Sequence, residues 1–358
     1  MFAEGTVLLR TTGVQQGDNA APAAFCFGTH DVWEAREGID GLLWQAWYMD
    51  DGTLVGRLSA VEEALQKITR LGAERGLQVN LGKCVLWTPA SADTVASHAA
   101  LSEVHRPPYA PTEGIRVLGA PVVHPAGDGE FSRRIFEKSV GQMREMCRVL
   151  THLPAAHVQY TLLRYCLDGC RLAFLLRATP ATHVVQEVGT SARLLRTTLG
   201  DVLGSQLTDS QWAQAVLPQR LGGLGIKSPA DMCIPARLAS CVDFLQRGRE
   251  VLGLPPDLTL FPADLPYVLS EATRHLGPRL EPLAAWVADP GAISHGDSTH
   301  TKQHWWGDRW HEVSAGRLLE SLSAREKARF TFQRDQKGGP WLGVAPCKAM
   351  GSGDRNPQ

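Results

Sequence analysis

The 358-residue sequence lacks the features of several protein classes. Its eight cysteines form no C-x-x-C pair, so no zinc ribbon or zinc knuckle is predicted. No uninterrupted apolar stretch reaches the roughly 18 residues that a membrane-spanning helix needs. The first residues carry neither the basic segment nor the apolar segment of a secretory signal. We therefore expect a soluble, intracellular protein, nuclear or cytoplasmic, that is not secreted and has no membrane partner.

Neither sign of charge is in large excess, because the net charge is -1. This balance argues against a protein wrapped in nucleic acid over its whole surface. Positive charge is nevertheless concentrated in residues 131–200, where ten lysines and arginines accompany four acids, so this segment carries +6 and the remainder -7. Two interpretations stay open for it: a surface that follows a phosphate backbone, or a solvated helical face.

Periodicity and turn residues predict an α+β layout for residues 1–87, with helices on one face of a sheet. Short strands are expected at 6–10, 42–48, 53–56, 77–80 and 84–87, and helices at 22–34 and from Ser59 to near Gly76. Asp50-Asp51-Gly52 is expected to form the tight turn of the first hairpin, because Asp-Gly is a strong turn signal. Ser59 and Glu62 have the spacing of a capping box.

The rest of the sequence predicts mainly helices. A strand pair at 116–123, broken near 119–121, precedes a mostly helical stretch from 131 to about 246. Residues 255–266 and 289–301 have the composition of linkers, and a last helix is expected at about 317–329.

Two adjacent carboxylates, Asp50 and Asp51, lie at the tip of the first expected hairpin. Side chains alternate along a strand, so the two cannot point the same way and one of them can face a cleft. Carboxylates on a rigid turn suit Mg²⁺, which takes one or two protein carboxylates together with substrate phosphates. The alternative interpretation is that Asp-Asp-Gly serves only as turn chemistry.

Four motifs occur in a particular order around this pair. They are Gly13-Val14-Gln15-Gln16-Gly17-Asp18, Tyr48-Met49-Asp50-Asp51, Gly76-Leu77-Gln78-Val79-Asn80-Leu81-Gly82-Lys83 and Leu118-Gly119. In order and spacing, the four together resemble the palm of reverse transcriptases, most closely those of non-LTR retrotransposons. Each motif alone is a weak signal, whereas the set of four is specific.

The resemblance implies an RNA-directed DNA polymerase, a nucleotidyltransferase. Its partners would be an RNA template, a DNA primer and deoxynucleoside triphosphates, and its chemistry would be two-metal transfer to the primer 3′-hydroxyl. Asp50 and Asp51 would be catalytic ligands of Mg²⁺ or Mn²⁺, and Lys83 would act at the leaving pyrophosphate. Nucleotide and template would meet Gln16, Gly17, Tyr48 and Met49, and the primer grip would be Leu118 and Gly119.

The resemblance also implies three regions. Residues 1–125 would be a partial reverse transcriptase palm, an antiparallel sheet with helices on one face. Residues 126–250 would be a helical thumb or connection that holds the duplex by its backbone. Residues 251–358 would be a helical carboxyl-terminal region with linkers and a disordered tail. Residues 222–226 and 337–342 extend the resemblance more loosely.

The sequence departs from the family before the glutamine-glycine loop. The family's other essential aspartate and its fingers belong there, whereas only twelve residues precede Gly13 and none of them is aspartate. We therefore expect an amino-terminally truncated polymerase fragment that is inactive alone, with fingers supplied by another chain. The alternatives are a non-catalytic nucleic-acid-binding remnant and the product of a decayed pseudogene.

Two further groups allow two interpretations each. The run His304–Trp310 predicts core packing of a carboxyl-terminal helix or, alternatively, a stacking platform for bases. His157, Tyr160 and Arg164 share one helical face, which would contact nucleic acid or be a plain solvated face.

Overall fold

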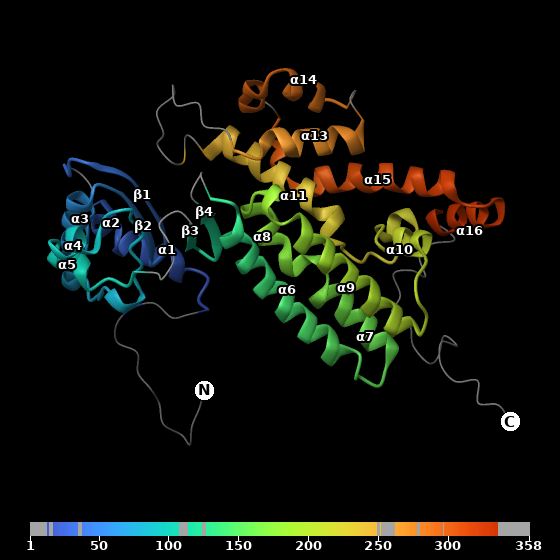
Figure 1. The fold of residues 1–358 in the computed structure, drawn as a ribbon, viewed down its shortest axis with the longest axis horizontal. Coiled ribbons are helices and arrows are strands. Elements are labelled where there is room, and N and C mark those ends of the chain that lie inside the picture. Colours follow the sequence, from blue (N-terminus) through green and yellow to red (C-terminus); the bar gives the residue numbers. More distant parts are fainter. Residues whose placement is uncertain are drawn as a thin grey trace. The chain divides into compact units, whose positions relative to one another are not determined.

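The structure is a computed structural model that describes residues 13, 17–34, 38–106, 114–123, 127–248, 251, 262–277, 280–295 and 297–335. The chain forms two compact units, Met1–Leu118 and Gly119–Gln358 (Figure 1). It is mostly helical, with two small antiparallel two-stranded sheets, β1-β2 and β3-β4, which agrees with the expected α+β class. Among the helices described, none combines the length and the apolar character needed to cross a membrane.

The first unit is built from one hairpin and short helices. Its elements are α1 (Ala21–Gly28), α2 (His30–Trp33), β1 (Leu42–Tyr48), β2 (Asp51–Gly56), α3 (Leu58–Glu74), α4 (Ala92–Ala96), α5 (Ala99–Ser102) and β3 (Gly114–Val117). The expected helix at 22–34 is therefore two helices, broken at Thr29. The strands expected at 77–80 and 84–87 are wrong, because this stretch has a 3-10 turn, Leu81–Lys83, and a single bridge from Val85 to His105. The strand expected at 6–10 lies outside the described residues.

Helix α3 supplies the small core of this unit. Ala60 and Ala64 are spaced four residues apart on one face, and they pack with Ile39 beneath the hairpin residues Leu42 and Leu54. The helix ends as expected near Gly76, which adopts a positive φ of 76°.

The beginning of α3 corrects the expected capping box. The helix starts at Leu58, so Ser59 lies inside it and caps nothing. Glu62 instead accepts a hydrogen bond from the backbone N–H of Ala100 (2.9 Å), and its second oxygen lies 2.6 Å from Nδ1 of His98. The His98 hydrogen bond holds the pKa of the Glu62 carboxyl below its usual value. Glu62 thus ties α3 to α5.

The second unit is helical apart from one strand. Its main elements are β4 (Ala120–Val123), α6 (Glu130–Leu150), α7 (Ala156–Leu162), α8 (Ala173–Ala178), α9 (Val185–Leu203), α10 (Asp209–Ala215), α11 (Pro229–Asp243), α13 (Leu265–Leu276), α14 (Leu283–Ala288), α15 (Gln303–Ser321) and α16 (Ala324–Arg334). A π-helical turn, Leu163–Leu167, and a 3-10 turn, Gly169–Leu172, connect α7 to α8. The last helix, expected at 317–329, is interrupted at Leu322 and Ser323.

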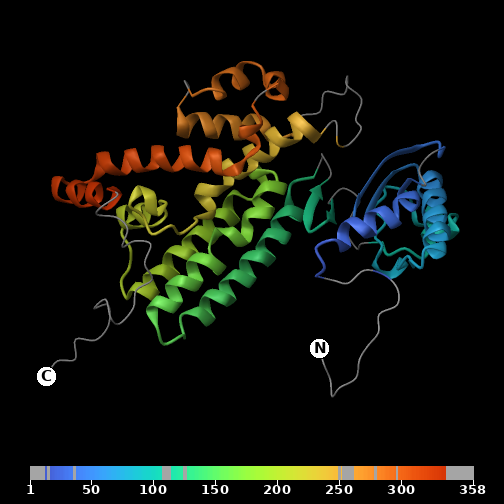
Figure 2. The ribbon, with the colours of Figure 1, turned by 180° about the vertical axis from the view of Figure 1, so that it is seen from behind.

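Helix α11 occupies the centre of this unit. Helices α6, α8 and α9 run on one side of it, and α13 and α15 lie on the other (Figures 1 and 2). Ala236 and Ala239 are fully buried, and their short side chains let the neighbouring helices approach closely. Helix α11 therefore joins the two layers into one hydrophobic core.

An ion pair inside this core fixes α11 to three other segments. The side chain of Asp264, which is 2% exposed, precedes α13 and lies 2.7 Å from Nη2 of Arg237 on α11. Asp264 also accepts a hydrogen bond from the backbone N–H of Ala181 (2.8 Å), while Arg237 donates to the carbonyl of Arg177 (3.0 Å). Buried charges are tolerated only when they are paired and hydrogen-bonded in this way.

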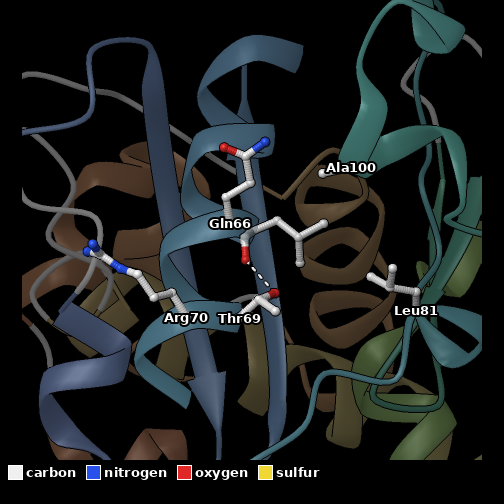
Figure 3. A pocket seen from close by; sticks show the side chains of 6 residues that line it. Gln66, Thr69, Arg70, Leu81 and Ala100 are labelled. Carbon is white, nitrogen blue, oxygen red and sulfur yellow. Dashed lines mark hydrogen bonds between the residues drawn. The ribbon is translucent and has the colours of Figure 1, made fainter. Parts of the chain in front are cut away.

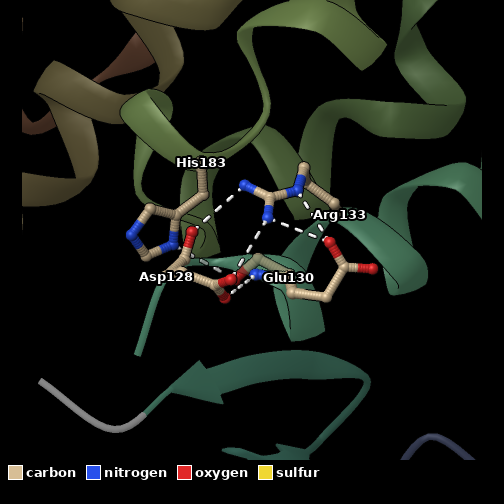
Figure 4. A network of polar contacts seen from close by, with 5 residues as sticks. Asp128, Glu130, Arg133 and His183 are labelled. Carbon is tan, nitrogen blue, oxygen red and sulfur yellow. Dashed lines mark hydrogen bonds and ion pairs between the residues drawn. The ribbon is translucent and has the colours of Figure 1, made fainter. Parts of the chain in front are cut away.

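Polar contacts also fix the start of α6 (Figure 4). Arg133 donates to the Glu130 carboxylate (2.9 Å) and to the backbone carbonyl of Asp128 (3.1 Å). Gly129 has a φ of 82°, and a Cβ atom there would lie 2.7 Å from the His183 ring. Glycine is therefore required at 129 both for its backbone conformation and for the close approach of His183.

The tryptophan-rich run on α15 contributes to the core. Trp306 is completely buried and donates a hydrogen bond to the carbonyl of His300 (2.7 Å), and Trp310 is 8% exposed. Trp305 is half-buried beneath the guanidinium of Arg309, at 3.3 Å from the ring centroid. Core packing is thus confirmed for Trp306 and Trp310.

His275 connects α13 to α15. Its ring is stacked on Trp310, with centroids 3.6 Å apart and an interplanar angle of 4°. Arg317 can only donate, so Nδ1 of His275 accepts from it (3.1 Å) and Nε2–H donates to the carbonyl of Trp310 (3.1 Å). The neutral ring satisfies both contacts, whereas a proton on Nδ1 would oppose Arg317. Burial lowers the pKa of His275.

We expect Asp264→Ala to lower the free energy of unfolding of the second unit by about 3–5 kcal/mol, because it leaves Arg237 buried without a counter-charge. The matched control is Glu145→Ala, which removes the partner of the exposed Arg148 and should lower the free energy of unfolding far less, because solvent screens an exposed pair. Urea unfolding followed by far-ultraviolet circular dichroism measures both. If Asp264→Ala does not fold, Asp264→Asn replaces it, and its free energy of unfolding should lie below that of the wild type and above that of a chain that does not fold. Equal losses for the two alanine variants would contradict the proposed role of the pair.

We also expect a pH effect at His275. Its folded pKa lies below its unfolded value of about 6.5, so its contribution to stability is complete above that pH and declines as the pH falls through the folded pKa. The wild-type protein should therefore lose more unfolding free energy than His275→Gln when the pH drops from about 7 to about 5. His304→Gln, at an exposed position of α15, is the control and should behave like the wild type. An identical pH dependence for His275→Gln and the wild type would contradict this assignment.

Candidate functional site

The hairpin of β1 and β2 carries the two adjacent carboxylates. The strands pair in register from Trp44 opposite Val55 to Tyr48 opposite Asp51, so the loop is Met49-Asp50. The expected turn at Asp50-Asp51-Gly52 is therefore wrong, since Asp51 and Gly52 belong to β2. Met49 has a φ of 55°, and a positive φ at the first loop position is what a two-residue hairpin turn requires.

Gly52 serves a packing role instead of a turn role. It lies opposite Trp47, and a Cβ atom at Gly52 would lie only 2.1 Å from the indole ring. Trp47 in turn stacks on Trp33 of α2, with centroids 4.1 Å apart, and Gln45 donates to the carbonyl of Trp33 (2.6 Å). These contacts fix one face of the hairpin against α2.

The carboxylates lie free at the end of this anchored hairpin. Asp50 and Asp51 are both exposed, and neither forms an ion pair or a side-chain hydrogen bond within the described part of the chain. Being consecutive, they project in different directions. Within the described residues no three or more His, Cys, Asp or Glu side chains are grouped as a metal site would require. The hairpin thus exposes two carboxylates at its end.

The other predicted residues lie on separate segments. Tyr48 is 66% exposed beside the carboxylates, and Lys83 is exposed at the end of the 3-10 turn Leu81–Lys83. Gly17 has a φ of 96°, and a Cβ atom there would meet no other atom within 4 Å. Gln16 lies outside the described residues. The structure thus brings Tyr48, Met49, Asp50 and Asp51 together on one hairpin.

Leu118 and Gly119, the predicted primer grip, do not lie in a strand. They form the turn between β3 and β4, with φ values of 49° and 88°. The break in the predicted strand pair therefore lies at 118–119 and not at 119–121. Among the described residues that are not glycine, Met49 and Leu118 are the two with positive φ.

A shallow hollow of about 320 Å³ lies elsewhere in the first unit (Figure 3). Leu65, Gln66, Thr69 and Arg70 of α3 line it together with Leu81 and Ala100. Thr69 is turned back to its own helix, where it donates to the carbonyl of Leu65 (2.7 Å). None of the predicted catalytic residues lines this hollow, so it is not the site that the motifs indicate.

The basic segment 131–200 holds both neutralised and free cations. Arg133, Arg148 and Arg196 form ion pairs with Glu130, Glu145 and Asp209 at 2.9, 2.6 and 2.7 Å. Within the described part of the chain, no ion pair involves Lys138, Arg144, Arg171 and Arg177. These four charges are available to an anionic partner.

The sequence did not reveal the Trp33–Trp47 stack that anchors the hairpin. A signal for it exists in the register, because a tryptophan opposite a glycine on a hairpin indicates a ring lying across the partner strand. Trp47 lies opposite Gly52 only in the register with the loop at Met49-Asp50.

Strands usually favour valine over glycine, but we expect the opposite order at Met49 because its φ is positive. Met49→Gly should leave the hairpin as stable or more stable, and Met49→Val should destabilise it by about 1–2 kcal/mol, because a β-branched residue tolerates positive φ poorly. Amide hydrogen exchange of the β1 strand measures this local stability. Val55→Gly on β2 is the control and should destabilise the hairpin. Greater protection in Met49→Val than in Met49→Gly would show that the turn lies elsewhere.

Comparison with known proteins adds no assignment to this geometry. No protein-family model and no curated protein matches the sequence. The chemistry of the site therefore follows from its residues: an anchored hairpin with two free carboxylates, and a separate helical unit with unneutralised positive charge.

Proposed function

We propose that this chain carries the catalytic hairpin of an RNA-directed DNA polymerase of the non-LTR retrotransposon type. The observation that carries the proposal is the order of four motifs, from the glutamine-glycine loop to Leu118-Gly119. In this proposal the first unit belongs to the palm, and the helices that follow form the thumb.

The backbone at two of these motifs supports the proposal. Met49 and Leu118, the two described non-glycine residues with positive φ, both lie in motif turns. Such conformations cost about 1–3 kcal/mol each and are often found at functional sites, where the surrounding structure maintains them. The stack of Trp47 on Trp33 provides such support for the turn at Met49.

The proposed roles follow from the positions of the side chains. As the resemblance implies, Asp50 in the loop is the principal metal ligand and Asp51 in β2 the weaker second one. Bound Mg²⁺ or Mn²⁺ would activate the primer 3′-hydroxyl and stabilise the charge that develops on the leaving pyrophosphate. Lys83 would supply positive charge or a proton to that pyrophosphate. Gln16, Gly17, Tyr48 and Met49 would contact template and nucleotide, and Leu118-Gly119 the primer.

We propose further that synthesis needs a second polypeptide segment. Two-metal sites use carboxylates from more than one strand, and the described residues place one pair on one hairpin. A further carboxylate from outside the β1-β2 hairpin would complete the site.

A second candidate function is nucleic-acid binding without catalysis. It is favoured by cations of the second unit that form no ion pair within the described part of the chain, among them Lys138, Arg144, Arg171 and Arg177. Binding by such charges would weaken steeply with salt, because it depends on the release of counterions from phosphates.

The metal proposal is tested by Fe²⁺-dependent hydroxyl-radical cleavage of the polypeptide in the presence of an RNA–DNA primer–template and a nucleotide. We expect cleavage near residues 48–52, competition by Mg²⁺, and loss of cleavage in the double variant Asp50→Asn/Asp51→Asn. Asp40→Asn, which changes an exposed aspartate before β1, should leave cleavage intact. Cleavage that persists in the double variant would exclude this hairpin as the metal site.

A primer-extension assay on an RNA template with Mg²⁺ tests the need for a second segment. The chain alone should give no extension. Extension by the chain alone that disappears in Asp50→Ala would support the polymerase assignment and refute the need for a second segment.

A further inference from the structure

The π-helical turn between α7 and α8 presents an aromatic ring to solvent. Leu163 and Leu167 at its ends are buried, at 0% and 8% exposure, whereas Tyr165 between them is 62% exposed. An extra residue in a helical turn rotates the following side chains, and such π-bulges occur frequently at functional sites. Here the bulge directs a large ring outward from an otherwise packed segment.

Arg164 lies against this ring in a constrained position. Its guanidinium carbon is 4.8 Å from the centroid of Tyr165. On Gly225, which has a φ of 73°, a Cβ atom would lie 3.2 Å from Nε of Arg164, so the guanidinium packs close to the bare glycine backbone. Burial raises the pKa of Tyr160, and the neighbouring Arg164 opposes part of that rise. Tyr160 is itself fixed by donating to the carbonyl of Leu224 (2.7 Å).

The geometry points to Arg164 and Tyr165 as a stacking site for single-stranded nucleic acid. This inference rests on the proposal that the chain handles nucleic acid, and it names a contact in the second unit that the motifs do not predict. A single strand offers both an open base face for the tyrosine ring and a phosphate for the guanidinium. A duplex keeps its base faces stacked inside and offers only phosphates from outside. The pair therefore distinguishes single strands from duplexes.

The surroundings of the pair favour a polyanion over a protein partner. Within the described residues Arg164 forms no ion pair with an acid, so its charge is not neutralised. Arg171, in the following 3-10 turn, is exposed and also forms no ion pair there. Exposed Val158 and Leu162 on α7 add apolar surface for sugars and bases beside the ring. On the shared face of His157, Tyr160 and Arg164, Tyr160 is held by its hydrogen bond to Leu224, and Arg164 interacts with both Tyr160 and Tyr165.

The test is fluorescence-anisotropy binding of a labelled DNA single strand of about 12 nucleotides, and of its RNA–DNA duplex, to the full chain over a series of salt concentrations. Tyr165→Ala should weaken single-strand binding about five- to one-hundred-fold with little change in salt slope, because it removes stacking and no charge. Tyr165→Phe keeps the ring and should bind within about twofold of the wild type. Its binding also shows that a substitution at 165 leaves the π-helical turn folded. Arg164→Gln should reduce the salt slope by about 0.7, the value for one phosphate on a single strand.

Matched variants separate stacking from general charge and from the metal hairpin. Arg164→Lys keeps the charge but loses the planar stack, so it should keep the salt slope and still bind more weakly. Phe174→Ala on α8 removes another exposed ring and should leave binding unchanged. Binding is measured without divalent metal, and Asp40→Asn, outside the metal hairpin, should bind the strand like the wild type, so a failure of the metal proposal does not affect this readout.

Three outcomes would overturn the inference. The first is unchanged single-strand binding by Tyr165→Ala. The second is an equal loss for the single strand and the duplex, which would indicate a phosphate contact only. The third is the absence of single-strand binding by the wild-type chain at moderate salt; if Tyr165→Ala then abolishes self-association in sedimentation, the surface is a protein contact.

Discussion

The packing of the second unit depends on the buried pair Arg237–Asp264. Removing two charges from water is costly, and here the cost is offset by their mutual contact and by hydrogen bonds to backbone groups of Arg177 and Ala181. Because those groups belong to the end of α8 and the turn before α9, the pair fixes the position of α11 between its two helical layers. The helices on both sides of α11 pack against it, and the π-helical turn leads into one of them, α8.

The first unit depends on a different and more local constraint. Its hydrophobic core is small, so the hairpin is positioned mainly by the Trp47 ring, which lies across Gly52 and stacks on Trp33. This packing fixes the register, and the register places Met49 in a left-handed conformation at the loop. Two free carboxylates at the end of an anchored hairpin are suited to an ion that is held jointly with substrate. In the proposed function, the tryptophan packing keeps the hairpin rigid, and Asp50 of the loop and Asp51 of β2 supply the ligands.

The two units present different chemistry to a nucleic acid. The hairpin offers carboxylates that form no ion pair within the described residues, whereas the helical unit also offers cations that form none there, and an exposed tyrosine ring beside a guanidinium. A polymerase requires both kinds of surface, since it must bind the phosphate backbone and also stabilise the charge of the transferred group. A plain binding protein requires only the second kind.

The sequence by itself determined the features that depend on neighbouring residues. Strand β1, the end of α3 at Gly76 and the helical character of residues 131–246 follow from apolar periodicity and from glycine, and the adjacency of Asp50 and Asp51 is covalent. The tertiary structure decided the features in which a distant group competes with local preference. Gly52 belongs to the strand because Trp47 needs its space, Glu62 binds Ala100 instead of capping α3, and Arg164 packs against the bare backbone of Gly225. These outcomes depend on contacts between side chains and backbone groups that local periodicity does not reveal.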